Sequence, residues 1–227
     1  MDARPRSLQS TMVDREATAE LLAALAYGER VASQRARENI RFAPDSRRAD
    51  AQRGIADREE RNCRLIESRL AEIGSADLTR RFEPFFDAFF EHTEPTGWVE
   101  AQAFHYVGDA LVSDFADTLV ELVDPVSAEI VRHTLGERED QEAFALEELT
   151  RALEEDPRAA ERVAAYSRRI VGEGLTQTAR ALGQSELLRQ LLGGGEGERR
   201  WVLNLLDGHR ARLDRLGIER IEADSFD

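Results

Sequence analysis

Residues 21–40 read LLAALAYGERVASQRARENI, and this stretch decides the fold. Its apolar side chains recur at steps of three and four residues, which places them on one face of an α-helix. They are Leu22, Leu25, Ala32, Ala36 and Ile40. Glu29 falls on the same apolar face, although a buried carboxylate needs a partner for its charge. The stretch therefore predicts a core helix that carries an acid into the interior.

A second helix repeats this feature. Pro44 interrupts the first helix, which we predict over 14–41, and the second is predicted to begin at a capping residue at 45 or 46 and to end at about 74. Its inward face carries Glu59, 30 residues after Glu29. Both helices of this first pair thus bring an acid to the same side.

Two further long helices are predicted over 98–123 and 125–155. Asp124 precedes a proline, which is a typical helix start. Asp109 lies in the first of these helices, and Arg138 stands 29 residues later in the second. The similar spacing in the two helix pairs predicts an all-α four-helix bundle.

The other segments are also expected to be helical. A phenylalanine-rich crossover at 77–95 has helical spacing, which indicates core packing rather than an aromatic binding platform. Additional C-terminal helices are predicted over 158–182, from 185 to the glycines at 193–195, and over 198–216.

The domain organisation follows from these elements. We predict a single helical domain over 14–218, a flexible N-terminal tail at 1–13 and an acidic C-terminal tail at 219–227. No apolar run is long enough to span a membrane, and residues 1–10 lack the apolar core of a secretory signal. These observations predict a cytoplasmic protein without a membrane partner.

Charge is distributed unevenly. The net charge is −14 and all 31 basic residues are arginine, which disfavours strong overall binding to nucleic acid. Residues 30–69, however, carry eleven arginines against seven acids, whereas residues 110–160 carry four against fourteen. Two solvated helix faces explain this pattern, and local RNA binding by the arginine-rich helix pair is the alternative.

A di-iron motif is missing from the bundle. Di-iron four-helix bundles take a Glu from each of two helices and a Glu-x-x-His from each of the other two. No Glu-x-x-His occurs in this chain. Asn62 stands where the first histidine is expected, three residues after Glu59, and the second pair reads Arg138 and Gln141. The scaffold is therefore that of a metal protein whose ligand set is degenerate.

The negative charge of the three interior acids can be balanced in two ways. Glu29, Glu59 and Asp109 are expected to meet in mid-bundle, where like charges repel strongly. If a metal balances them, it would be iron or manganese, with His105, one turn before Asp109, as a further ligand.

The second way to balance this charge is a cation that the chain itself supplies. Arg138 stands where a fourth acid is expected, and its guanidinium can bridge two carboxylates through forked hydrogen bonds. Asn62 and Gln141 can donate amide hydrogens to the remaining oxygens. This interpretation predicts an interior polar cluster in place of the metal site, formed by Glu29, Glu59, Asn62, Asp109, Arg138 and Gln141.

At these residues the chain resembles the ferritin-like tRNA 2-methylthio-isopentenyl-adenosine hydroxylases and their relatives in high-GC bacteria. The resemblance covers about residues 20–218. The segments that carry it are Ala26-Tyr27-Gly28-Glu29, 59–74, Trp98 through Asp114-Phe115, Asp124-Pro125 and Arg169-Ile170-Val171-Gly172-Glu173.

The resemblance implies a ferritin-like bundle with additional C-terminal helices. It also implies that the matching positions bind iron in the hydroxylases. This chain keeps an acid at Glu29, Glu59 and Asp109 and lacks the other three ligands, including both histidines. That loss argues against di-iron oxygen activation.

Three functions remain open. The first is a non-catalytic protein without a cofactor, which binds an unknown protein partner, assembles as a homo-oligomer or has a structural role. The second is an iron-dependent oxidoreductase of the hydroxylase type that uses the reduced ligand set. The third is a scaffold that binds RNA through the arginine-rich helix pair.

Overall fold

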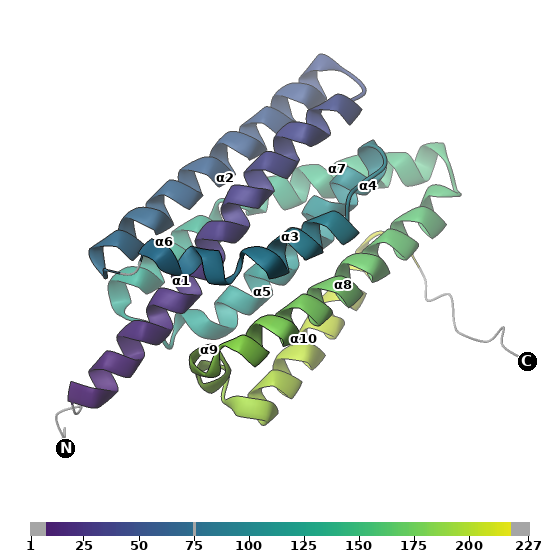
Figure 1. Cartoon of the computed structure of the whole chain (residues 1–227). Helices are drawn as coiled ribbons and strands as arrows, with labels where there is room; N and C mark the ends of the chain where they lie inside the picture. The colour runs from purple at the N-terminus through teal and green to yellow at the C-terminus, as the bar shows by residue number, and fades with distance from the viewer. Residues whose placement is uncertain (1–7, 75, 219–227) are drawn as a thin grey trace, which may run out of the picture.

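The computed structural model describes residues 8–74 and 76–218, and these ranges contain helices and turns but no strand. Figure 1 shows the longest helices lying side by side, with shorter helices connecting them. The predicted all-α fold is confirmed. None of the helices in the described ranges is both long and apolar enough to cross a membrane.

The first helix pair is an antiparallel hairpin (Figure 1). Helix α1 (Leu8–Asn39) is joined to α2 (Ser46–Glu72) through the 3-10 turn η1 (Ile40–Phe42). Asp45 caps α2 as predicted, because its side chain accepts a hydrogen bond from the Arg48 amide at 2.9 Å.

Helix α1 begins earlier than the predicted start at Asp14. Residues 8–13 contain no glycine or proline that would stop a helix, and a helix extends readily once its later turns are packed. Part of the predicted tail at 1–13 is therefore helical. Residues 1–7 and the predicted acidic tail at 219–227 lie outside the described residues.

The crossover between the helix pairs contains the turn η2 (Ala76–Arg81) and helix α3 (Glu83–His92). Phe82, Phe89 and Phe90 are buried. The phenylalanines therefore contribute to the core, as their spacing predicts.

The third long helix is interrupted, contrary to the prediction of one continuous helix over 98–123. It consists of α4 (Trp98–Ala103), a π-helical segment η3 (Phe104–Gly108) and α5 (Asp109–Val120). In the π-helical segment the Asp109 amide donates to the Phe104 carbonyl, five residues back instead of four.

The fourth long helix is also divided. Helix α6 (Pro125–Gly136) ends before Arg138, and α7 (Glu139–Glu155) begins directly after it. At the break the Arg138 amide donates to the Leu135 carbonyl at 3.1 Å, a tighter turn than an α-helix makes. The predicted continuous helix over 125–155 was therefore wrong at this point.

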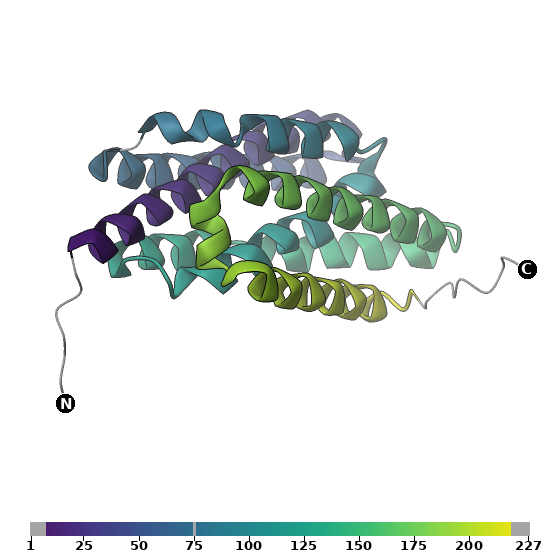
Figure 2. The same ribbon diagram turned by 60° about the horizontal axis from the view of Figure 1, so that its bottom comes forward.

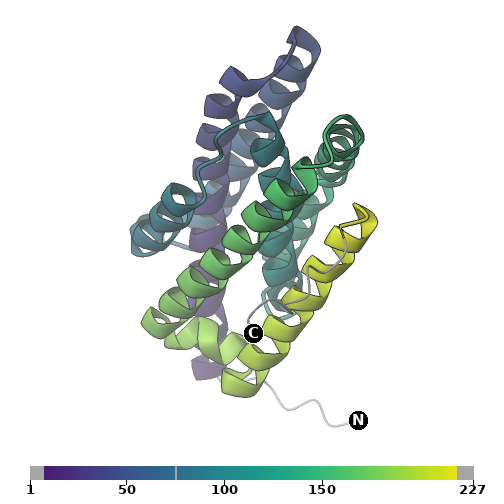
Figure 3. The same ribbon diagram turned by 90° about the vertical axis from the view of Figure 1, so that its right-hand side faces the viewer.

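The additional C-terminal helices are α8 (Ala159–Gln184), α9 (Glu186–Leu191) and α10 (Gly194–Arg215). Figure 2 shows α8 and α10 running along the bundle, with α9 at the turn between them. Figure 3 shows α10 on the side of the bundle away from α2.

Helix α10 starts before the predicted position 198, because the glycines at 193–195 turn the chain into it rather than only ending α9. Gly193 and Gly194 have φ of 89° and 68°, a left-handed conformation that glycine adopts readily. Gly197 is needed for packing: a Cβ there would lie 1.5 Å from the Leu192 carbonyl oxygen.

Two apolar clusters flank the interior acids. The main core includes Ala26 of α1 and Ile66 of α2, and a smaller cluster contains Ala36, Ile55 and Ala56. Along both helices the acid lies between the two clusters. The fold thus places carboxylates where water is excluded on either side.

Candidate functional site

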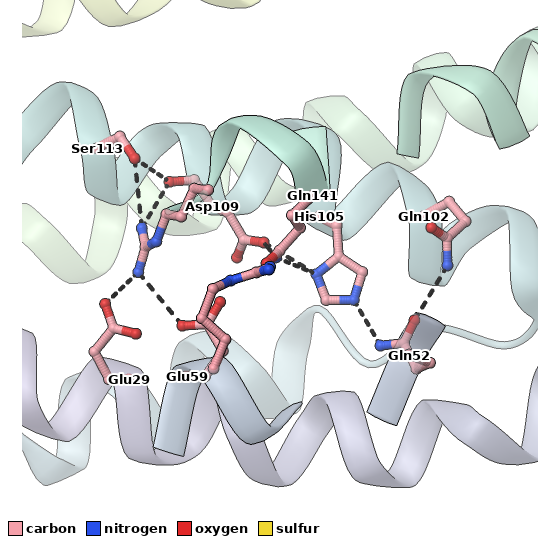
Figure 4. A network of polar contacts seen from close by, with 10 residues as sticks. Glu29, Gln52, Glu59, Gln102, His105, Asp109, Ser113 and Gln141 are labelled. Carbon is pink, nitrogen blue, oxygen red and sulfur yellow. Dashed lines mark hydrogen bonds and ion pairs between the residues drawn. The ribbon is translucent and has the colours of Figure 1, made fainter. Parts of the chain in front are cut away.

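The four long segments of the bundle each contribute one charged residue to the interior. Glu29 comes from α1, Glu59 from α2, Asp109 from the start of α5 and Arg138 from the break between α6 and α7. All four are buried, with exposed fractions of 2%, 1%, 8% and 7%. We refer to these residues as the Arg138 cluster. Figure 4 shows Glu29 and Glu59 pointing from neighbouring helices into the same interior space.

The guanidinium of Arg138 connects the cluster. Its Nη2 donates a hydrogen bond to Glu29 Oε1 and lies 3.7 Å from Glu59 Oε2. Its Nη1 donates to the Asp109 backbone carbonyl at 3.2 Å and to Ser113 Oγ at 3.4 Å. This one cation therefore links its own segment to the other three, and the Arg138 side chain points toward the interior acids.

Charge and burial oppose each other in the carboxyl pair. Burial raises the pKa of Glu29 well above its ordinary value, and Arg138 offsets this only in part because Glu59 and Asp109 add negative charge. Burial acts on Glu59 in the same direction, but the neighbouring Glu29 carboxyl and the charges of Arg138 and Arg58 outweigh burial and lower its pKa. Burial thus favours the protonated form of Glu29, whereas the groups around Glu59 favour its ionised form.

A proton on Glu29 would also provide a partner for unpaired polar atoms. Glu29 Oε2 and both carboxylate oxygens of Glu59 are buried and accept no hydrogen bond from the described residues. A proton on Glu29 turns one of these oxygens into a donor. The combined charge of Glu29, Glu59 and Arg138 then becomes zero, which lowers the cost of burying them.

A second part of the network is centred on His105. Its Nδ1 lies 3.0 Å from Asp109 Oδ2, and its Nε2 lies 2.8 Å from Gln52 Nε2 (Figure 4). Gln102 donates to Gln52 Oε1 at 3.3 Å, so the Gln52 amide group faces the histidine. The hydrogen bonds therefore assign the proton of a neutral His105 to Nδ1, where it is donated to Asp109.

Gln141 links the two parts. Its side-chain amide donates to Asp109 Oδ2, and its oxygen accepts a hydrogen bond from Arg58. Asn62 is 2% exposed, yet its amide nitrogen has no partner within residues 8–74 and 76–218. Gln141 thus donates to one of the interior carboxylates. The expected donation by Asn62 was wrong, since its amide nitrogen donates to no described residue.

Comparison with known families accounts for this bundle. A family model described as a ferritin-like domain of actinomycetes matches residues 13–195. The chain belongs to this family. No curated protein matches the chain.

The match assigns α1 to α9 to the ferritin-like domain and leaves nearly all of α10 beyond it. The predicted ferritin-like bundle with additional C-terminal helices is therefore confirmed. The ferritin-like domain also explains why four helical segments converge on one interior position, since proteins of this architecture build their sites from side chains on facing helices.

The donor set of this ferritin-like domain does not fit a di-iron centre. Within residues 8–74 and 76–218, no group of three or more His, Cys, Asp or Glu side chains is arranged to hold a metal ion. Glu29 Oε1 faces the Arg138 guanidinium rather than a vacant position. Both ring nitrogens of His105 already face hydrogen-bond partners. The arrangement suits a buried ion pair with amide partners.

Sequence reasoning missed four members of the network, Arg58, Gln52, Gln102 and Ser113. Gln52 lies seven residues before Glu59 on α2 and is completely buried, so helical spacing places both on one face. The same spacing argument, applied to polar residues as well as acids, identifies Gln52. Ser113 can be identified as a member of the network only once the position of Arg138 is known.

Proposed function

We propose that this ferritin-like domain acts without a di-iron centre, as a binding or structural protein. The observation that supports this proposal is the Arg138 guanidinium, which lies between Glu29 and Glu59 in the bundle interior. A guanidinium stays protonated in proteins, so it offers no position for a second cation beside it. The relation to tRNA hydroxylases and a cytoplasmic location remain predictions from the sequence.

Metal content tests this proposal directly. After expression in medium rich in iron and manganese, we expect the purified chain to contain far less iron than the two ions of a di-iron centre. The measurement is metal per chain by mass spectrometry. Iron close to one ion per chain would support instead the oxidoreductase with Glu29, Glu59, Asp109 and His105 as ligands. A content near two would refute the proposal.

A gain-of-binding variant sharpens this test. The triple substitution Arg138→Glu, Asn62→His and Gln141→His supplies the four acids and two histidines of a di-iron set. We expect it to take up more iron than the matched single variant Arg138→Gln, which removes the cation without adding a ligand. Equal iron contents would show that the restored ligands do not create a metal site.

The RNA-binding alternative is less well supported by the surface. Arginines of the first helix pair face acids of the same pair: Arg37 lies 3.3 Å from Asp57, and Arg64 lies 2.9 Å from Glu60. Such ion pairs reduce the positive potential that phosphates need. Ion pairs thus engage several of these arginines, and Arg41 and Arg48 pair with Glu94 and Glu148 outside the first helix pair.

We accordingly expect weak binding to a single-stranded RNA oligonucleotide, with a Kd above about 10⁻⁴ M at physiological salt. Fluorescence anisotropy in low and physiological salt measures this. A Kd in the micromolar range that weakens steeply with added salt would favour the RNA scaffold, and Arg64→Glu should then abolish it.

A further inference from the structure

Helix α10 buries little of its surface for its length. Of its 22 residues, all within the described ranges, three are buried: Gly197, Trp201 and Leu205. Helix α8, with 26 residues, has nine. Two further apolar residues, Leu216 and Ile218, are buried directly after α10. Figure 3 shows α10 at the edge of the bundle. Because apolar burial is the main favourable contribution to helix packing, α10 gains less from docking than α8 does.

Docking also leaves polar atoms of α10 without partners. The Trp201 indole nitrogen, Glu198 Oε1 and His209 Nδ1 are buried and form no hydrogen bond within residues 8–74 and 76–218. A buried polar atom without a partner has lost its hydrogen bonds to water without replacement. If α10 left the bundle, water would reach all three atoms. Docking of this helix therefore carries a cost that undocking removes.

Ion pairs contribute to the docking of α10. Arg212 donates to both carboxylate oxygens of Asp114 on α5 at 3.2 Å, and Arg215 lies 3.5 Å from Glu142 on α7. The Tyr106 hydroxyl donates to the Arg212 backbone carbonyl at 3.2 Å. Salt screens ion pairs that are accessible to solvent. The docking of α10 should therefore depend on ionic strength more than the packing of helices that rely on apolar contacts.

The connection that leads into α10 can act as a hinge. Gly193 and Gly194 have φ of 89° and 68°. Gly195 and Gly197 follow in the first turn of the helix. Glycine changes its backbone conformation more readily than other residues and weakens a helix that contains it. The family model also ends at residue 195, so the ferritin-like domain and α10 meet within this run of glycines.

We propose that α10 is a detachable helix: together with residues 216–218 it undocks from the folded ferritin-like domain as one unit and turns at the glycines of 193–197. Ionic strength sets the balance between the docked and undocked states through the two ion pairs. Undocking uncovers Phe115 of α5, which Trp201 contacts edge to face with ring centroids 5.5 Å apart. The proposal concerns a conformational change outside the Arg138 cluster and does not depend on the metal content of the bundle.

Hydrogen–deuterium exchange of the full chain, followed by mass spectrometry, measures this opening. We expect the amides of 198–215 to share one protection factor, at least about 100-fold lower than that of the buried residues 17–26 of α1, because undocking leaves the bundle folded. Raising the sodium chloride concentration from about 0.01 M to about 0.5 M should lower the protection of α10 roughly threefold to tenfold. The protection of 17–26 should change by less than about twofold.

Two arginines of α10 provide a matched pair of variants. Arg212→Gln removes the ion pair with Asp114, so it should lower the protection of α10 at low salt by roughly threefold to tenfold and remove most of the response to salt. Arg210→Gln is the control, because Arg210 is an exposed arginine of the same helix, and it should change neither quantity. Asp114→Asn should reproduce the effect of Arg212→Gln from the other side of the contact.

His209→Leu tests the cost of the unpaired polar atoms. Leucine removes the buried ring nitrogen and keeps an apolar side chain in its place. We expect the protection of α10 to rise roughly threefold to tenfold, because docking no longer removes this nitrogen from water. A lower protection in His209→Leu would show that the histidine stabilises the docked helix and would count against the proposal.

Three further results would overturn the proposal. The first is equal protection of 198–215 and 17–26, which would mean that α10 opens only when the whole chain unfolds. The second is a loss of protection confined to the last turn of α10, which would indicate fraying of the helix end. The third is the same response to salt in Arg212→Gln as in the wild type, which would remove the ion pair from control of docking.

Discussion

Arg138→Ala is expected to lower the free energy of unfolding by about 3–5 kcal/mol, because it leaves buried carboxylates without their cation. For a chain of this size, that corresponds to a loss in Tm on the order of 10 °C. Arg47→Ala is the control, since Arg47 is exposed on α2, and it should change the stability by less than about 0.5 kcal/mol. Urea unfolding followed by circular dichroism measures both variants.

The same variant should respond to pH in a defined direction. Without Arg138, Glu29 and Glu59 lose the charge that lowers the pKa of each. Their folded pKa values then rise above the unfolded values, so the penalty is present at high pH and disappears as the pH falls toward the unfolded pKa. Arg138→Ala should therefore lose less stability at pH 5 than at pH 8. A loss that is small, or the same at both pH values, would contradict the buried-cation role.

Much of the fold follows from local chemistry, which is readable in the sequence. Asp124 precedes Pro125 and accepts hydrogen bonds from the Val126 and Ser127 amides at 3.1 Å, as its capping signature predicts. Ser185 likewise caps α9. Caps depend on neighbouring residues alone, so they are predictable without knowledge of the packing.

The two interruptions of the long helices could not be predicted in this way. Neither the π-helical segment Phe104–Gly108 nor the break at Arg138 contains a proline. A π-helical turn inserts one residue and shifts everything after it, Asp109 included. Whether such a shift is favourable depends on contacts with other helices, such as that of His105 with Gln52. Tertiary packing therefore decides these backbone details.

The candidate site was predictable in its charges but not in all its partners. Three inward acids require a cation, and Arg138 was the cation on an inward position of the fourth helix. Hydrogen-bond partners, by contrast, were only partly predictable: the Gln141 amide donates to Asp109, whereas the Asn62 amide nitrogen has no partner among the described residues. Charge balance is a property of composition and spacing, whereas hydrogen-bond pairing requires coordinates.

If Glu29 and Glu59 share one proton, substitutions at these two positions should be strongly non-additive, which is the second large effect. Glu29→Gln imitates the protonated carboxyl and should change stability at pH 7 by no more than about 1 kcal/mol. In Glu59→Gln the remaining Glu29 can ionise and pair with Arg138, so the loss should again be modest. The double variant leaves Arg138 with neither carboxylate and should lose about 3–5 kcal/mol.

The pH dependence separates the two positions. The raised pKa of Glu29 gives a stabilisation that is complete below its unfolded pKa and is lost as the pH rises through the folded value. Glu29→Gln should therefore gain stability relative to the wild type as the pH increases. The lowered pKa of Glu59 gives a stabilisation that is lost as the pH falls through the folded value. Glu59→Gln should therefore gain relative to the wild type at acid pH.

The double-variant cycle decides whether the proton is shared. If the two ion pairs were independent, the losses of unfolding free energy in the two single variants would add up to the loss in the double variant, within about 0.5 kcal/mol. A proton shared between Glu29 and Glu59 gives a loss in the double variant that exceeds the sum of the single losses by about 2–3 kcal/mol, because either carboxylate alone can neutralise Arg138. Urea unfolding of the four proteins at pH 7 measures the cycle. Additive losses would mean that each carboxylate is separately ionised and that Arg138 does not balance them as a unit.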